Sequence, residues 1–353
     1  MAAVTAPISR IRSRLRPGGG GSGGVRSPRS SYLYLLPAFG VMGLITLYPL
    51  IFQTWMSFTD TEGKHLNLRL HLVPDWVGTK NYTDVISSAL AIPNFDFLRL
   101  IIYNLWWAFS NVAIHLVLGV AIALLLNSKG LWFRRFYRSM YIIPVVIPAI
   151  IVATVWANMF DASNGAINLL LAMGGKFLGM PAAAFHIDWL RQIKAPIDWL
   201  LPSVAGGPLL ALPLAYYAML LTNTWLGWPL NSVVATGALQ SIPADLYEAA
   251  EIDGATAWQK FRNVTLAYLR PAMVPYAIYG FVITFNLFSL AFFMSQGGPD
   301  GRTQLLVTQA YYLVNEQRLY GVAAAFSVIM FFILLAITLV TNRLTKATQS
   351  YSL

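Results

Sequence analysis

Residues 100–128, LIIYNLWWAFSNVAIHLVLGVAIALLLNS, hold no Asp, Glu, Lys or Arg. A bilayer core of about 30 Å needs roughly 20 helical residues, so this run is long enough to cross a membrane. Lipid tolerates only helices and closed barrels, and a long apolar run without alternating polarity indicates a helix. The stretch therefore predicts a membrane-spanning helix.

Further charge-free runs accompany it along the chain, at 30–59, 139–160, 199–244, 271–299 and 319–342. Each is long enough for a span. The chain is only 11% charged, whereas soluble domains are about 25% charged. We therefore predict an all-α integral membrane protein with six transmembrane helices, at about 33–57, 100–127, 139–160, 205–235, 271–295 and 319–342.

The fourth run is longer than one span needs, and it is rich in residues that interrupt helices. It contains Gly206, Gly207, Pro208, Pro213, Gly227 and Pro229. Proline removes a backbone donor inside a helix and clashes with the preceding turn. The run is therefore predicted to be interrupted rather than straight.

Positive charge indicates how these helices are oriented. Most lysines and arginines lie before the first run or after the even-numbered runs, in residues 1–32, Lys129, Arg134, Arg135, Arg138, Lys260, Arg262, Arg270, Arg343 and Lys346. Because cytoplasmic loops carry the excess of Lys and Arg, both termini are predicted to be cytoplasmic. Topology then explains the net charge of +10, and no nucleic-acid partner is required.

Outside the spans, the chain leaves little room for a second domain. Residues 1–30, with arginines around a Gly/Ser tract, are predicted to be a disordered basic cytoplasmic tail. Residues 31–346 form the predicted transmembrane domain, and 347–353 a cytoplasmic C-terminal tail. A signal peptide is a weaker alternative, because its apolar region is usually about 7–15 residues and the first run is far longer.

Residues suited to enzymatic or metal chemistry are few and scattered. The chain has no cysteine, which excludes disulfides and thiolate chemistry, and it has no phosphate-binding loop for ATP. Its four histidines lack the spacing of metal ligands, so we predict no catalytic residue, no metal site and no cofactor. His115 alone lies in a predicted span, where it is either functional or hydrogen-bonded between helices.

The polar segment between the fourth and fifth runs has a pattern of its own, IPADLYEAAEIDGATAWQKFRNVTLAYLRPAMVP from Ile242. Pro243 suits the first turn of a helix, and the acidic residues after it suit the positive helix end. Gly254 is typical of a helix end, and a second amphipathic segment with Trp258 and Phe261 follows. Two short helices around a glycine predict a docking element for a soluble partner, with a purely structural loop as the alternative.

This segment resembles the EAA loop of binding-protein-dependent ABC importer permeases, in which the loop forms a helix that fits a cleft of the ATPase subunit. The resemblance covers residues 241–268 and assigns ATPase coupling to Glu248, Ala249, Ala250, Asp253 and Gly254. Ala267 departs from it, because the family commonly has proline there. The resemblance implies a type I ABC importer permease fold in the cytoplasmic membrane. The implied partners are a second permease subunit, an extracytoplasmic sugar-binding protein and two copies of an ATPase that binds ATP and Mg²⁺.

A longer stretch, LLTNTWLGWPLNSVVATGALQSIPADLYEAAEIDGA from Leu220, is similar to the membrane subunits of maltose and maltodextrin importers. Segments 141–160 and 285–301 share this similarity, whereas 176–198 has no counterpart. The resemblance implies substrate contacts at Asn223, Leu226, Gly227, Leu230, Thr284 and Asn286. Ile283 also falls at a contact position, while Leu230, Leu287, Val145 and Ala149 replace polar or aromatic residues. A sugar is therefore implied, but not maltose itself.

Together these observations predict the permease subunit of an ATP-driven, maltodextrin-like sugar importer. Amides and hydroxyls in aromatic-rich spans without charge suit a neutral polar solute, although such groups also form bonds between helices. The alternatives are a permease for another neutral solute, such as a different oligosaccharide or a polyol, and an integral-membrane enzyme. The enzyme would need clustered Asp, Glu or His at one interface, and the sequence offers none.

Overall fold

The computed structural model describes residues 28–67, 69–128, 130–181, 185–193, 210 and 212–345, with side chains from Tyr34 onward. The chain forms two compact units, which are divided between Gln53 and Thr54. The described residues form helices and loops without a β-strand, and an isolated antiparallel bridge joins Thr59 to Trp76. The predicted all-α class is confirmed for this part of the chain. Residues 1–27 of the predicted N-terminal tail and the whole C-terminal tail lie outside it.

The described part of the first unit is one long apolar helix. It contains α1 (Pro28–Met42), the π-helical turn η1 (Gly43–Leu47) and the first part of α2 (Tyr48–Met56). The continuous segment Tyr34–Met56 has 23 residues and is long and apolar enough to cross a membrane. Large hydrophobic side chains are exposed along its length, as suits a helix in contact with lipid. It coincides with the first predicted span.

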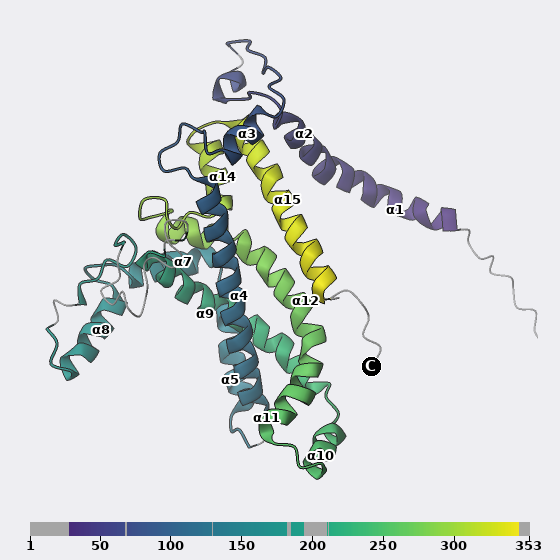
Figure 1. The fold of residues 1–353 in the computed structure, drawn as a ribbon, viewed down its shortest axis with the longest axis vertical. Helices are drawn as coiled ribbons and strands as arrows, with labels where there is room; N and C mark the ends of the chain where they lie inside the picture. The colour runs from purple at the N-terminus through teal and green to yellow at the C-terminus, as the bar shows by residue number, and fades with distance from the viewer. Residues whose placement is uncertain are drawn as a thin grey trace, which may run out of the picture. The chain divides into compact units, whose positions relative to one another are not determined.

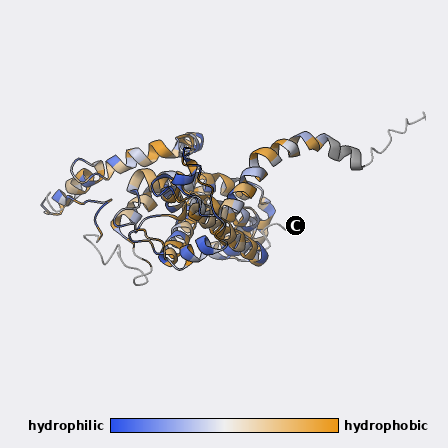
Figure 2. Cartoon of the chain, turned by 90° about the horizontal axis from the view of Figure 1, so that it is seen from above, coloured by the Kyte–Doolittle hydropathy of each residue, from blue (hydrophilic) through white to orange (hydrophobic). Residues whose placement is uncertain are grey.

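The second unit is built around α4 (Phe97–Asn127), which packs along α9 (Leu214–Gln240) and α12 (Leu266–Phe285). Its last long helix, α15 (Tyr320–Thr345), contacts α3, α12 and α14. Figure 1 shows α3 and α14 at one end of this bundle, with α10 and α11 at the other. Orange, the colour of hydrophobic residues, is widespread in the helices when the chain is seen from above (Figure 2). The remaining elements are η2 (Gly63–Leu66), α3 (Lys80–Ile86), α5 (Arg134–Tyr141), α6 (Ile143–Val146), α7 (Ala149–Met159), α8 (Ala166–Phe177), α10 (Ala244–Ile252), α11 (Ala257–Lys260), η5 (Phe261–Thr265), α13 (Phe288–Leu290), η6 (Ala291–Ser295) and α14 (Leu306–Asn315).

Two glycines allow α4 and α9 to approach each other closely. A Cβ atom at Gly119 would lie 2.4 Å from the Cβ of Asn231, and one at Gly227 would lie 2.1 Å from Cε1 of His115. Small residues at helix contacts are typical of membrane bundles, in which close van der Waals packing drives association. Gly119 and Gly227 therefore determine how α4 and α9 cross.

Within the described residues, 4 helices are long and apolar enough to cross a membrane, at 34–56, 97–127, 257–295 and 320–345. A bent helix pair, α5–α6 with α7, is a further candidate. The helix α9 has 27 residues, but its polar side chains make it less apolar than these. The fifth predicted span, 271–295, lies inside the apolar helical segment 257–295, which continues through Pro271 and Pro275 and is interrupted after Phe285.

Prolines break a different helix from the one that the sequence predicts. The helix α9 begins only after Pro213, whose ψ is 166°, and is continuous through Gly227 and Pro229, so the predicted interruption is wrong at these last two residues; residues 206–208 lie outside the described part. The segment 139–160, predicted as a single span, is instead bent by 94° between α6 and α7. Pro148 disfavours helical geometry at the preceding residue, Ile147, whose ψ is 129°.

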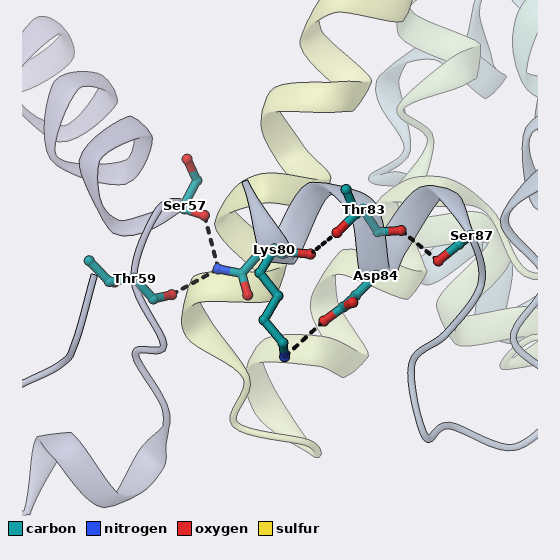
Figure 3. Close-up of polar contacts among 7 residues, drawn as sticks. Ser57, Thr59, Lys80, Thr83, Asp84 and Ser87 are labelled. Carbon is teal, nitrogen blue, oxygen red and sulfur yellow. Dashed lines mark hydrogen bonds and ion pairs between the residues drawn. The ribbon is translucent and has the colours of Figure 1, made fainter. Parts of the chain in front are cut away.

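A polar cap holds the chain segment 57–61 against α3. Asn81 on α3 donates from Nδ2 to the backbone oxygens of Ser57, at 2.9 Å, and Thr59, at 2.8 Å (Figure 3). Lys80 and Asp84 form an ion pair of 3.2 Å on the same helix. The N–H of Gly321 donates to the oxygen of Thr61 at 2.8 Å, which joins the segment to α15 as well.

We expect Asn81→Ala to lower the stability of the second unit by roughly 2 kcal/mol or more, because two buried carbonyl groups lose their donor. Lys80→Ala is the matched control on the same helix, since an exposed ion pair contributes at most about 1 kcal/mol. Thermal unfolding of the purified complex in detergent measures both changes. Equal shifts of the unfolding temperature in the two variants would show that the bonds of Asn81 to Ser57 and Thr59 do not stabilise the second unit.

Candidate functional site

A cavity of about 500 Å³ lies between α6, α7, α9 and α12, beside His115 of α4. Five of the six predicted substrate contacts lie in its wall: Asn223, Leu226, Gly227, Leu230 and Thr284. The further positions that the resemblance pointed to also line it: Val145, Ala149, Ile283 and Leu287. The fold thus brings together residues that the sequence places in three separate apolar runs.

Asn286 is the predicted contact that does not line the cavity. The helix α12 ends at Phe285, and Asn286 follows it as an exposed residue. Its Nδ2 donates to the backbone oxygen of Val282 at 3.0 Å. The side chain therefore satisfies the end of its own helix, and the structure gives it no place in the wall.

Helical periodicity explains why several α9 residues share the wall. Asn223, Gly227 and Leu230 are spaced four and three residues apart, which places them on one face. Asn223 is 5% exposed, and its Nδ2 donates to Oδ1 of Asn111 at 2.7 Å. Its Oδ1 has no hydrogen-bond partner among the residues that the structure describes. This oxygen is thus the group of Asn223 that a solute can reach.

The bend between α6 and α7 shapes the opposite wall. Ile147 and Pro148 have non-helical backbone, and both line the cavity. At membrane depth, non-helical backbone is tolerated only where it is buried in protein or lines a water-filled cavity. The bend therefore supports a solvated path at this place.

A polar stripe on α4 was not part of the predicted site. It consists of side chains three or four residues apart on one helix face: Asn104, Trp107, Asn111 and His115. Asn104 Nδ2 and Trp107 Nε1 donate to the backbone oxygens of Phe285 and Thr284, each at 3.2 Å. These bonds hold the end of α12 beside the cavity.

The other half of the polar stripe holds α9. Asn111 accepts from Asn223, and it donates from its own Nδ2 to the oxygen of Trp107 at 2.7 Å. His115 Nε2 lies 2.9 Å from the backbone oxygen of Asn223. The spacing of these polar residues within an apolar run is a signal that the sequence contains, but only the fold shows which helices the stripe joins.

The chemistry of the wall suits a neutral solute. The cavity is mostly apolar, and its polar side chains are amides, hydroxyls and an imidazole. No Asp, Glu, Lys or Arg occurs among its described lining residues. Apolar pockets with a few placed polar groups bind and orient uncharged ligands, whereas an ion would require charge or a cage of carbonyl groups.

The predicted coupling residues form a short helix and its end, at the end of the bundle opposite to α3 (Figure 1). The helix α10 begins after Pro243, and Gly254 follows it with φ +73°. The N–H groups of Gly254 and Ala255 donate to the oxygens of Glu251 and Ala250, at 3.0 and 2.9 Å. Glycine adopts this left-handed conformation at a helix end with little steric cost, because it has no Cβ.

Two contacts brace α10 against the helix that follows. Lys260 Nζ lies 2.7 Å from Oε1 of Glu251, and the Tyr247 hydroxyl lies 2.9 Å from that of Thr265. The predicted residues Glu248, Ala249, Asp253 and Gly254 are exposed, and Ala250 is half-buried. Two large apolar side chains are exposed beside them: Ile252 at 86%, and Trp258 of the predicted second amphipathic segment at 67%. A braced helix with an acidic and apolar outer face is typical of a docking surface.

Residues 115–349 match the protein family described as "Binding-protein-dependent transport system inner membrane component". The chain is 29% identical to the maltodextrin transport system permease protein MdxF of Bacillus subtilis, over 90% of this chain and 69% of that protein. It is 31% identical to the maltodextrin transport system permease protein MalC of Streptococcus pneumoniae serotype 4, over 88% of this chain and 67% of that protein.

Among solved structures, the chain is similar to one from a bacterial alginate ABC transporter in complex with an alginate pentasaccharide-bound periplasmic protein. The TM-score is 0.68 at 20% identity, and the match covers 91% of this chain and 96% of that chain. This similarity shows that the two chains share a fold.

Proposed function

This chain belongs to the family of binding-protein-dependent transport system inner membrane components, and we propose that it is the permease subunit of an ATP-driven importer for neutral oligosaccharides of the maltodextrin type. Family membership makes it a multi-pass protein of the inner membrane and a transporter component rather than an enzyme. The alternative of an integral-membrane enzyme is thereby excluded.

The observation that carries the proposal is the uncharged cavity of about 500 Å³. Sugar hydroxyls require hydrogen-bond partners when they are buried, and Asn223 and Thr284 offer them in an otherwise apolar wall. Two relatives that cover most of this chain are named as maltodextrin permeases. Another oligosaccharide or a polyol remains the second candidate, because Leu230 and Leu287 supply no polar group.

The proposed topology has six spans and cytoplasmic termini. The helices α9 and α5–α7 would complete the set, because α9 is long enough to cross and the bent pair is apolar. Loops rich in Lys and Arg then lie on the cytoplasmic side, together with α10.

The proposed assembly contains a second permease subunit, two copies of an ABC ATPase and an extracytoplasmic sugar-binding protein. ATP and Mg²⁺ would be bound by the ATPase, into which α10 would dock. Because α10 is braced to the helix that continues into α12, movement of the ATPase would be passed to the cavity.

Uptake by the reconstituted complex tests this function. Proteoliposomes containing all the subunits are expected to accumulate labelled maltotriose when ATP is supplied to the ATPase and the sugar-binding protein is present. Labelled polyols, and maltotriose without ATP, serve as controls. Accumulation of a polyol but of no oligosaccharide would contradict the proposal.

Asn223→Ala is expected to reduce transport efficiency by roughly 5- to 150-fold, since a buried sugar hydroxyl loses its partner. Asn286→Ala is expected to have a much smaller effect, because Asn286 lies outside the wall. Initial uptake rates at several sugar concentrations measure both variants.

Asn111→Ala separates substrate contact from helix packing, because it removes the partner of Asn223 without changing a residue of the wall. Asn111→Ala should therefore impair transport less than Asn223→Ala does. Equal losses in these two variants would show that Asn223 acts only by joining α4 to α9.

A further inference from the structure

We propose that His115 determines specificity for the transported sugar by accepting a hydrogen bond at Nδ1 from one substrate hydroxyl. This inference rests on the proposed function, and it adds a residue from α4 to a site otherwise built from α6, α7, α9 and α12. The imidazole of His115 is a polar group within an apolar helix, and it lines the cavity.

The position of the ring is well defined by its neighbours. His115 is 6% exposed and lines the cavity together with Gly227. A Cβ at position 227 would lie 2.1 Å from Cε1 and 2.3 Å from Nδ1 of the ring. Nε2 would lie 2.5 Å from the same Cβ, so the imidazole packs against Gly227 in the space that the missing side chain leaves, beside the cavity.

The bond to α9 determines which nitrogen carries the proton. His115 Nε2 lies 2.9 Å from the backbone oxygen of Asn223, and a carbonyl oxygen can only accept. A neutral imidazole must therefore carry its proton on Nε2, which leaves Nδ1 with a lone pair. Nδ1 has no hydrogen-bond partner within the described ranges, so its lone pair can accept a hydrogen bond from a hydroxyl of the solute.

Few side chains in this wall can accept a hydrogen bond, so the lone pair on His115 Nδ1 adds an acceptor that a sugar hydroxyl can use. Asn223 offers its Oδ1 while its Nδ2 donates to Asn111, and Asn231 Nδ2 donates to the backbone oxygen of Gly227 at 3.0 Å. Val145, Ala149 and Leu287 supply only apolar surface. A sugar buried here needs acceptors for its hydroxyl protons. A site that is built to bond one hydroxyl discriminates against the analogue that lacks it.

Two substitutions separate the roles of the two ring nitrogens. The amide of glutamine reaches about as far as Nε2, so His115→Gln keeps a donor for Asn223 and removes the acceptor at Nδ1. The shorter amide of asparagine lies near the position of Nδ1, so His115→Asn keeps an acceptor there and loses the bond to α9. A merely structural histidine would be replaced better by glutamine.

The test uses the complete complex in proteoliposomes, with maltotriose and its set of monodeoxy analogues as probes. The wild type is expected to prefer maltotriose over one analogue by about 5- to 10-fold, the effect of one hydrogen bond. His115→Gln should reduce that preference to nearly one, while the preferences for the other hydroxyls stay unchanged. His115→Asn should retain a larger share of it. Copurification of the ATPase controls for assembly.

A His115→Gln complex that discriminates among all the analogues as the wild type does would overturn the inference and leave the proposed function intact. Failure of both variants to assemble would also overturn it, because the role of the histidine would then be structural. A wild type that takes up no maltodextrin would instead overturn the proposed function, and this inference with it.

Discussion

A Gly254→Pro complex is expected to assemble in the membrane but to lose nearly all of its sugar-stimulated ATP hydrolysis. Proline holds φ near −65°, whereas Gly254 has φ +73°. Proline also lacks the N–H that donates to Glu251 at 3.0 Å. The end of α10 must therefore rearrange, together with the ion pair between Glu251 and Lys260. ATPase activity with and without sugar-loaded binding protein measures the loss.

Gly254→Asn is the matched control, since asparagine tolerates the left-handed region better than other side chains. It is expected to keep most of the stimulation. Wild-type stimulation in the Gly254→Pro complex would show that α10 does not couple the permease to the ATPase. An equal loss in both variants would mean that the glycine is required for a reason other than its backbone conformation.

The second large effect is expected at Gly227. In Gly227→Ala, the new methyl group would lie 2.1 Å from the His115 ring, which is buried between α4 and α9. The ring must move into the cavity or the two helices must separate. Overpacking of this kind costs about 1–3 kcal/mol. If this cost weakens sugar binding in the cavity, uptake falls by roughly 5- to 150-fold. Labelled-sugar uptake at several concentrations is the measurement.

Gly237→Ala provides the comparison on the same helix. A Cβ at Gly237 meets no other atom within 4 Å, and alanine favours helix. This variant should transport as the wild type does. Normal uptake by the Gly227→Ala complex would mean that the contact between His115 and Gly227 does not shape the path.

The sequence predicts the helical runs and the helix end at Gly254 well, because both depend on local properties. Absence of charge over 100–128 is sufficient to indicate a helix, and α4 spans Phe97–Asn127. Gly254 after a short acidic helix is a local signal for a left-handed helix end, and its φ is +73°. The clustering of Asn223 with Thr284 followed from the resemblance, and the cavity contains both.

The sequence does not show which proline breaks its helix. Pro148 forces extended backbone at Ile147, and the chain bends there by 94°, whereas Pro271 and Pro275 lie within a continuous helix. Pro229 stands alone and is buried within a continuous helix. Asn286 lies outside the wall because α12 ends at Phe285. A hydrogen bond from Asn104 on α4 holds this helix end, and the local sequence pattern does not reveal that bond.

In the proposed function, the cavity between α6, α7, α9 and α12 holds the transported sugar. A cryo-EM structure of the complete complex, trapped with an inactive ATPase in the presence of maltotriose, tests it most directly. We expect sugar density within hydrogen-bonding distance of Asn223 Oδ1 and the Thr284 hydroxyl, with one hydroxyl beside His115 Nδ1. Density for the sugar at another place along the path, with this cavity closed around its own side chains, would contradict it.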